Sequence, residues 1–435
     1  MERSSGSRGR RLSRFSRHRR VRCGLALALL AAAALALATG TGCDRADRAS
    51  SVVIWEQMDP GEQALLDAHI AAFRAEHPEF DGFAITRSHY RIEDLRTQFQ
   101  TAALAYGGPN LVYGPADNVG PFAIMGLILP MDEILPPGEL ERFAPEALPV
   151  LDDRVYGLPD QVGNHLTLVA NRALVDSIPT DTDAWLAQLR AVTRDLDGDG
   201  RTDRYGLVFN MIEPFWLVPW LGGCGGWVMD DRGEPTLAGE AMTCALSFMR
   251  ELTVAGVVPR ECDYPLADTL FKEGRAAYII NGPWSWEGYR AGGIDIELAP
   301  LPRVSATGLW PSPMTSAKCY SVNRYLDPAT RECTVALLRY LTSTQVQIDL
   351  ALALGTLPAD LAARADPRVA DDALQQASRR QIEKGRLMPV VPEMRAIWDA
   401  MRPYYQGVLS GKLEPAEAAR RMQERAEREI ERMRE

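Results

Sequence analysis

The chain has 435 residues, of which 46% are hydrophobic and 24% are charged, which is ordinary composition for a soluble globular protein. This length allows two or three domains. The formal net charge of −10 at pH 7 argues against a nucleic-acid partner, because binding to phosphates requires a basic surface.

The first 42 residues predict an export signal rather than part of the fold. Nine arginines lie between Arg3 and Arg22, residues 25–38 are rich in alanine and leucine, and small residues precede Cys43. A basic region followed by an apolar run too short to span a membrane is typical of a secretory signal peptide. Removing residues 1–42 changes the formal charge to −18, which also argues against adhesion of the folded part to anionic lipid headgroups.

The residues Gly40-Thr41-Gly42-Cys43 resemble a bacterial lipobox, although Gly40 stands where leucine is usual. The resemblance implies a lipoprotein signal peptide at residues 1–42 and lipidation of Cys43. The protein would then be exported and anchored in a membrane, facing the periplasm or the cell exterior. Each buried methylene of an acyl chain would contribute about 0.8 kcal/mol to anchoring. Residues 43–50 are small and polar, as expected of a tether.

After the tether, predicted strands and helices alternate. We expect strands at residues 52–55, 83–86 and 111–113, and helices at residues 62–76 and 92–105. In the first helix Leu66, Ile70 and Phe73 share one face, which is the spacing of a buried helix face. Strands separated by helices predict a parallel sheet. Short helices are expected at residues 119–125 and 136–147.

A second unit of the same kind is predicted from residue 167. Strands are expected at residues 167–171, 205–210, 276–280 and 294–298, and helices at residues 183–195 and 239–255. Residues 319–322 are expected to return to the first unit, followed by helices at residues 332–341 and 343–354. Pro415 is expected in the first turn of a final helix.

The segment 271–286, FKEGRAAYIINGPWSW, combines a helix end, a buried strand and a turn. Gly274 ends the helix, and Gly282-Pro283 turns the chain after the strand. Trp284 and Trp286 therefore follow the carboxyl end of a strand, where α/β proteins bind ligands. We predict that Trp284 faces a ligand with flat apolar surfaces and that Trp286 belongs to the core.

The pattern FxxGxAAxxINGPWxW resembles extracellular solute-binding proteins of the maltose/maltodextrin type, the receptor subunits of ATP-binding-cassette (ABC) importers. The resemblance runs from about Val52 to the C-terminus. It implies a two-lobed α/β fold of the periplasmic-binding-protein type, with a hinge and a ligand cleft between the lobes. Residues 51–162 and 320–357 would form the first lobe, and residues 163–319 and 358–435 the second. It also implies ABC permease partners and a maltodextrin-like oligosaccharide as ligand.

A sugar presents C–H faces that pack on aromatic rings and hydroxyls that need polar partners when buried. In the first lobe Asp59 follows the first strand, and Asp117 and Asn118 follow the third. The resemblance assigns a sugar hydroxyl to Asp59, although a helix N-cap is an equally good interpretation of this residue. Gly114 stands where the family often has tryptophan, so one stacking platform is missing.

The other candidate ligand residues lie at the crossover and in the second lobe. Asn164 aligns with a family glutamate, and His165 beside it is interpreted as a hinge residue with satisfied hydrogen bonds. Glu213, Phe215 and Trp216 match a Glu-Pro-aromatic-aromatic segment of the family. Trp398 and Arg402 match its last tryptophan and an arginine that reaches the ligand. Trp220 and Trp227 are expected to be structural.

The loop DLDGDGRTD places Asp195, Asp197, Asp199 and Asp203 at the spacing of a calcium-binding EF-hand loop. Position 12 of such a loop is Gly206 rather than glutamate, so a turn rich in aspartate and glycine is the alternative. Apart from structural calcium in this loop, no cofactor is expected. Five cysteines follow Cys43, so at least one thiol is unpaired, and Cys244 could form a disulfide with Cys262.

Two other functions stay open from the sequence. A glycoside hydrolase would use two carboxyl groups on either side of the scissile bond, and Asp59, Asp117 and Glu213 offer such groups. None of them lies in a recognisable catalytic motif, so a protein that is not an enzyme is expected. A binding lipoprotein could also serve a sugar sensor instead of an importer.

Overall fold

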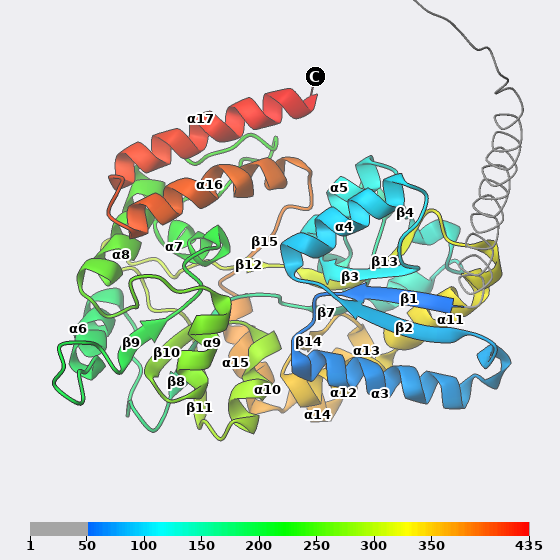
Figure 1. Ribbon diagram of the computed structural model, residues 1–435, viewed down its shortest axis with the longest axis horizontal. Helices are drawn as coiled ribbons and strands as arrows, with labels where there is room; N and C mark the ends of the chain where they lie inside the picture. The colour runs from blue at the N-terminus through cyan, green and yellow to red at the C-terminus, as the bar shows by residue number, and fades with distance from the viewer. Residues whose placement is uncertain (1–50, 435) are drawn as a thin grey trace, which may run out of the picture.

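The computed structural model describes residues 51–434, so the predicted signal peptide and tether, with Cys43, lie outside the described residues. The described chain forms two lobes that lie side by side (Figure 1), and each lobe has its own hydrophobic core. This confirms the predicted two-lobed α/β fold. Within residues 51–434, no helix has the length and apolar character needed to cross a membrane.

The first lobe contains a seven-stranded sheet with the order β14-β7-β13-β3-β1-β2, in which β4 also pairs with β13. β1 pairs in parallel with β2 and β3, as the alternation of strands and helices predicts. β13 runs antiparallel to β3 and β7, so the complete sheet is mixed. The strands are β1 (Ser51–Glu56), β2 (Ala84–His89), β3 (Leu111–Pro115), β4 (Ile128–Leu129), β7 (Leu158–Val162), β13 (Ala317–Asn323) and β14 (Leu357–Pro358).

Helices cover the faces of this sheet. Leu66, Ile70 and Phe73 of α3 are buried in the first core, as their spacing predicts. The predicted helix at 136–147 is wrong, because this segment holds two short 3-10 turns, Glu139–Arg142 and Pro145–Ala147. The helices are α3 (Pro60–Glu76), α4 (Ile92–Leu104), α5 (Val119–Ile124), α11 (Arg331–Leu341), α12 (Thr344–Leu354), α13 (Leu361–Ala365) and α14 (Pro367–Ala370).

The second lobe contains a four-stranded sheet with the order β11-β8-β10-β9. All six residues of β10 are buried, as expected of the apolar run after Gly274. The strands are β8 (Thr167–Asn171), β9 (Tyr205–Val208), β10 (Ala276–Asn281) and β11 (Ile296–Ala299). The helices are α6 (Thr182–Val192), α7 (Val218–Gly223), α8 (Glu240–Val254), α9 (Tyr264–Lys272), α10 (Pro283–Ala291), α15 (Ala373–Ile382), α16 (Glu393–Leu409) and α17 (Pro415–Arg434).

The lobe boundaries differ from the predicted ones at two places. Residues 317–319 belong to the first lobe, because β13 begins at Ala317 and pairs there with Val162 of β7. Residues 358–370 also lie with the first lobe, since α13 and α14 pack on α12 through Ala363 and Val369. The second core resumes at Ala377 of α15. Near the crossings, β12 (Met314–Thr315) pairs with β15 (Arg386–Leu387).

The disulfide in the second lobe joins Cys224 to Cys244, not Cys244 to Cys262. Cys224 caps the end of α7, and α7 packs on α8, which carries Cys244. The two Cα atoms are therefore 6.1 Å apart, a distance that a disulfide spans. Cys262 is buried as a free thiol, and so are Cys319 and Cys333.

Candidate ligand-binding site

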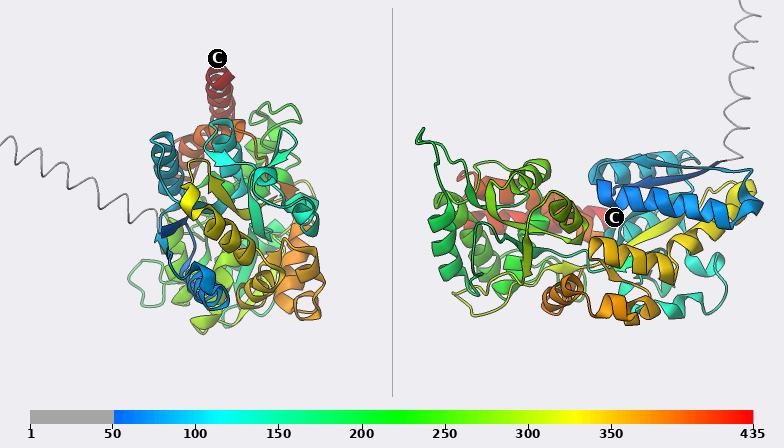
Figure 2. Two further views of the ribbon diagram at one scale, coloured as in Figure 1. Left: turned by 90° about the vertical axis from the view of Figure 1, so that its right-hand side faces the viewer. Right: turned by 90° about the horizontal axis from the view of Figure 1, so that it is seen from below.

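The two lobes touch where α3 and α10 begin. Helix α10 of the second lobe packs on α3 and α12 of the first. At Gly61 a Cβ atom would stand 3.0 Å from a Glu287 carboxylate oxygen and 3.6 Å from a Leu354 methyl group, so the chain is closely surrounded there. Figure 2 shows the two lobes from the side and from below. This contact brings Asp59, just before α3, close to Trp284 in the first turn of α10.

One hydrogen bond connects the lobes at this point, and a second one within the second lobe extends it to Trp284. The Tyr264 hydroxyl donates to Asp59 Oδ2 over 2.8 Å, and the Trp284 indole N–H donates to the Tyr264 oxygen over 3.0 Å. Sequence reasoning missed Tyr264. The signal that could have found it is Asp263-Tyr264-Pro265, an N-cap followed by proline at the start of a helix, which places the tyrosine at a helix terminus.

Asp59 is at once a helix N-cap and a member of this cross-lobe contact, so both interpretations of it describe the same residue. Its own N–H donates to Glu62 Oε2 over 3.1 Å. Burial, and after it the negative charge of Glu62, raise the pKa of Asp59 to about 6, although the Tyr264 hydrogen bond and the positive charge of Lys318 oppose this. Such a carboxyl group changes its charge near neutral pH, so its ability to accept a sugar hydroxyl depends on pH.

The Trp284 ring is held in place from two sides. It folds over Gly282, where a Cβ atom would stand 2.1 Å from the ring. Glycine is required here for lack of space rather than for its backbone conformation, which is extended. On another side, Lys318 Nζ lies 5.6 Å from the ring centroid, within the range of a cation–π interaction. Trp284 remains partly exposed, as a stacking platform must be, whereas Trp286 is fully buried, as predicted.

Three aromatic rings continue from Tyr264 through the second lobe. The centroid distances are 6.4 Å from Tyr264 to Trp216, 5.7 Å from Trp216 to Phe215 and 6.3 Å from Phe215 to Trp398. Trp216 and Trp398 are only 6% and 8% exposed, and the Trp216 indole N–H donates to the Ile280 carbonyl oxygen. Phe215 is more exposed than these two tryptophans. The structure thus brings the predicted aromatic residues together, with two of them largely inside the second core.

An ion pair stands beside these rings. Arg402 Nη2 donates to Glu213 Oε2 over 2.8 Å, and Arg402 Nη1 donates to Asp399 over 3.3 Å. Glu213 directly precedes the Pro214–Trp216 turn, and Arg402 lies one turn after Trp398 on α16. The fold thereby joins two candidate residues that are 189 positions apart in the sequence.

The remaining first-lobe candidates follow β3. Asp117 and Asn118 form the 3-10 turn Ala116–Asn118, at the same edge of the sheet as the end of β1. The Asn118 amide lies against Gly114, where a Cβ atom would stand 3.3 Å from its nitrogen. The glycine that replaces the family's tryptophan is therefore covered by Asn118 rather than left open.

Asn164 and His165 lie at the hinge. The Asn164 amide donates to Ser316 Oγ over 3.3 Å and so joins two segments that cross between the lobes. His165 is fully buried, with Nδ1 2.7 Å from the Gly163 carbonyl oxygen and Nε2 3.4 Å from Ser378 Oγ. Burial lowers the pKa of His165 to about 4. This confirms the interpretation of His165 as a satisfied hinge histidine.

Three of the four aspartates in the predicted calcium loop gather. Asp195, Asp197 and Asp203 each offer a carboxylate oxygen, and these oxygens lie within 4.8 Å of one another. The Asp199 carboxylate accepts the Arg201 N–H instead. The carboxylates also accept backbone N–H groups of their own loop, as in a turn rich in aspartate and glycine. Calcium in this loop stays a prediction.

Two lobes joined by several crossings, with acidic and aromatic side chains converging where they meet, define a two-lobed binding protein. Residues 68–377 match the family model described as bacterial extracellular solute-binding protein, and the chain belongs to this family. Its members are extracellular, which agrees with the predicted export.

Similar proteins of known ligand extend this picture. The chain is 40% identical to the maltose/maltodextrin-binding domain of Bdellovibrio bacteriovorus solved with maltotriose, a match that covers 88% of this chain and 100% of that one with a TM-score of 0.85. It is 27% identical to the maltotriose-binding protein of Pyrococcus abyssi, over 81% of this chain and 76% of the relative. It is 24% identical to the galactooligosaccharide-binding protein of Bacillus subtilis, over 88% and 90%. All three are named for binding, and this chain is a binding protein rather than an enzyme.

Proposed function

We propose that the protein is the substrate-binding subunit of an ABC sugar importer and that it holds a malto-oligosaccharide between its lobes. The observation that carries the proposal is the cross-lobe contact of Asp59, Tyr264 and Trp284, which continues into the rings of Trp216, Phe215 and Trp398. A carboxylate and a phenol can bond sugar hydroxyls, and the partly exposed indole can stack on a sugar ring.

The position of this cluster gives the ligand a mechanical role. A ligand that contacts both lobes binds the closed arrangement better than the open one, and it therefore shifts the population toward closure. Permease subunits of the importer would recognise the closed form. We infer this partner from the family, and the lipid anchor at Cys43 from the N-terminal residues together with a Streptococcus pneumoniae relative that is named a lipoprotein.

Titration calorimetry with maltotriose tests the proposed ligand. We expect saturable binding of one maltotriose per chain, and much weaker binding of a galactooligosaccharide of equal length. The reverse preference would indicate that the chain binds galactooligosaccharides, as the name of the Bacillus subtilis relative states for that protein. No heat with either sugar would contradict the proposal, and the appearance of reducing ends during incubation would restore the hydrolase alternative.

Sugar affinity is expected to fall as the pH drops through about 6, because the pKa of Asp59 is raised to about 6. A sugar hydroxyl that donates to Asp59 favours the ionised carboxylate, so binding releases a proton and is strongest above this pKa. With a pKa of about 6, the ionised fraction of Asp59 falls about tenfold between pH 7 and pH 5. Sugar affinity should therefore fall up to about tenfold over this range. Calorimetry at several pH values measures this, and Asp59→Asn should flatten the profile. An unchanged profile in that variant would assign the pH dependence to another group.

A further inference from the structure

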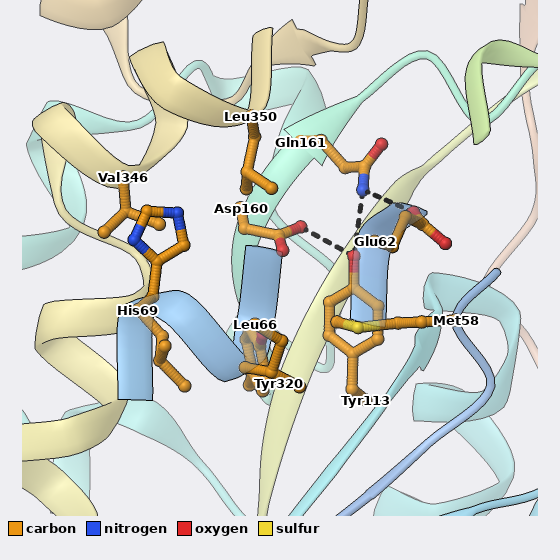
Figure 3. Close-up of a pocket in the computed structure, with 11 residues that line it drawn as sticks. Met58, Glu62, Leu66, His69, Tyr113, Asp160, Gln161, Tyr320, Val346 and Leu350 are labelled. Atoms are coloured by element: carbon orange, nitrogen blue, oxygen red, sulfur yellow. Dashed lines mark hydrogen bonds between the residues drawn. The ribbon is translucent and has the colours of Figure 1, made fainter. Parts of the chain in front are cut away.

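A buried polar network lies directly behind Asp59 in the first lobe. Lys318 Nζ of β13 donates to Glu62 Oε1 of α3 over 2.7 Å, and the Gln161 amide of β7 donates to the same oxygen over 3.3 Å. Gln161 also donates to the Tyr113 hydroxyl, which donates to Asp160 Oδ1 over 3.1 Å. Figure 3 shows the acidic part of this network around a cavity of about 10 Å³. Glu62 and Asp160 are each 2% exposed, and Lys318 is 5% exposed.

This network is short of positive charge. Asp59, Glu62 and Asp160 contribute three carboxyl groups, whereas Lys318 is the cation that acts on both Asp59 and Asp160. Burial, and then the charge of Glu62, raise the pKa of Asp160 to about 8. An unpaired buried carboxylate is strongly unfavourable, so the Lys318 ammonium determines how much negative charge the α3 N-terminus can hold.

Charged and polar groups from both lobes act on Asp59. Glu62 of its own helix and Asp268 of α9 disfavour its ionised form, whereas the Tyr264 hydroxyl and Lys318 favour it. Glu287 of α10 adds a carboxylate against the neighbouring Gly61. Asp268 is itself paired with Lys272 over 2.7 Å, whereas Lys318 acts on Asp59 directly, so removal of Lys318 should make ionisation of Asp59 harder.

Lys318 also reaches the second lobe. Its ammonium lies 5.6 Å from the centroid of the Trp284 ring, so one buried side chain from β13 touches both the acid behind Asp59 and the aromatic ring opposite. Cation–π contacts are strongest where the cation is shielded from water, as it is here.

We infer that Lys318 is a positioning residue of the sugar site: its ammonium neutralises Glu62 behind Asp59 and supports the Trp284 ring, so that both groups offered to the sugar depend on one buried lysine. The inference rests on the proposed function, because it concerns the same two side chains. It assigns to Lys318 and Glu62 a role in ligand binding without contact to the ligand.

The test uses Lys318→Met, which keeps the length of the side chain and removes its charge. Tryptophan fluorescence of the ligand-free protein is measured as a function of pH. The Trp284 indole is hydrogen-bonded to Tyr264, which is hydrogen-bonded to Asp59, so the fluorescence should report the charge of Asp59. We expect a wild-type midpoint near pH 6 that is lost in Asp59→Asn. In Lys318→Met the midpoint should rise by about one pH unit, and Lys318→Arg should restore it. Maltotriose affinity of Lys318→Met should fall about threefold even at pH 8.

A double variant keeps the inference testable if Lys318→Met does not fold. Lys318→Met combined with Glu62→Gln leaves neither charge unpaired, so it should fold where the single variant does not. It should keep the wild-type midpoint to within about half a pH unit, because an opposing pair has been removed, and should still bind maltotriose more weakly through loss of the Trp284 support.

Each outcome separates the two proposals. A wild-type midpoint in Lys318→Met, together with wild-type maltotriose affinity in Lys318→Met and in the double variant, would overturn the positioning role while sugar binding stands. A shifted midpoint in a protein that binds no maltotriose would support the positioning role and overturn the proposed ligand.

Discussion

Replacing Trp284 by alanine is expected to weaken maltotriose binding by about thirty-fold. The indole folds over Gly282 and donates a hydrogen bond to Tyr264 at the boundary of the lobes, and its exposed part is the surface that it offers to a sugar ring. Loss of the stacked ring and of its bond to Tyr264 together should cost roughly 2 kcal/mol of binding free energy, which corresponds to this change in affinity. Calorimetry on the purified variant measures it.

Trp310→Ala is the matched control for this experiment. Trp310 also belongs to the second lobe and is 38% exposed, but its ring faces Arg303 and Lys384 rather than the site residues. We expect wild-type affinity from this variant and similar melting temperatures for both. Equal affinities in the two alanine variants would remove Trp284 from the site.

Gly120→Ala is expected to lower the unfolding free energy by about 2 kcal/mol. A Cβ atom at Gly120 of α5 would stand 1.8 Å from the Val390 carbonyl oxygen, so the backbone of one segment has to move. Val390 lies between β15 and α16 and packs against the first core. Forcing atoms into a closely packed contact typically costs about 1–3 kcal/mol. Thermal unfolding should show the loss as a fall of several degrees in Tm.

Gly82→Ala provides the comparison within the same lobe. No heavy atom lies within 4 Å of a Cβ atom placed there. Alanine reduces the freedom of the unfolded chain, so this variant should match or slightly exceed the stability of the wild type. If Gly120→Ala is as stable as Gly82→Ala, the backbone at Val390 can move aside without a loss of unfolding free energy.

Local signals in the sequence predicted most single elements of this fold. The apolar run of β10 between Gly274 and Gly282, and the spacing of Leu66, Ile70 and Phe73 on α3, each predict an element that the structure contains. The prediction failed where distant segments decide the outcome. Neither the pairing of Cys224 with Cys244 nor the start of β13 at Ala317 has a local signal, because each depends on which elements become neighbours.

The same distinction applies to the candidate site. Trp284, Glu213 and Phe215 carry local motifs. The structure links Trp284 to Phe215 through Tyr264 and Trp216, and it pairs Glu213 with Arg402. Tyr264 and Lys318 lie in no such motif, although Tyr264 joins Asp59 to Trp284 and Lys318 joins Glu62 to the Trp284 ring. The partners of Lys318 follow from the register of β13 and from helix packing, and Glu62 is 256 positions away from it in the sequence.

The place of β13 in the first sheet bears on how an exported chain can reach its folded form. β13 lies between β7 and β3, so the sheet stays split until residues 317–323 are available. Contacts between segments so distant in sequence form slowly. A nascent polypeptide would therefore remain loose enough to thread through a secretion pore until most of its length has emerged. Late completion of this central strand is therefore expected to favour an unfolded precursor during export.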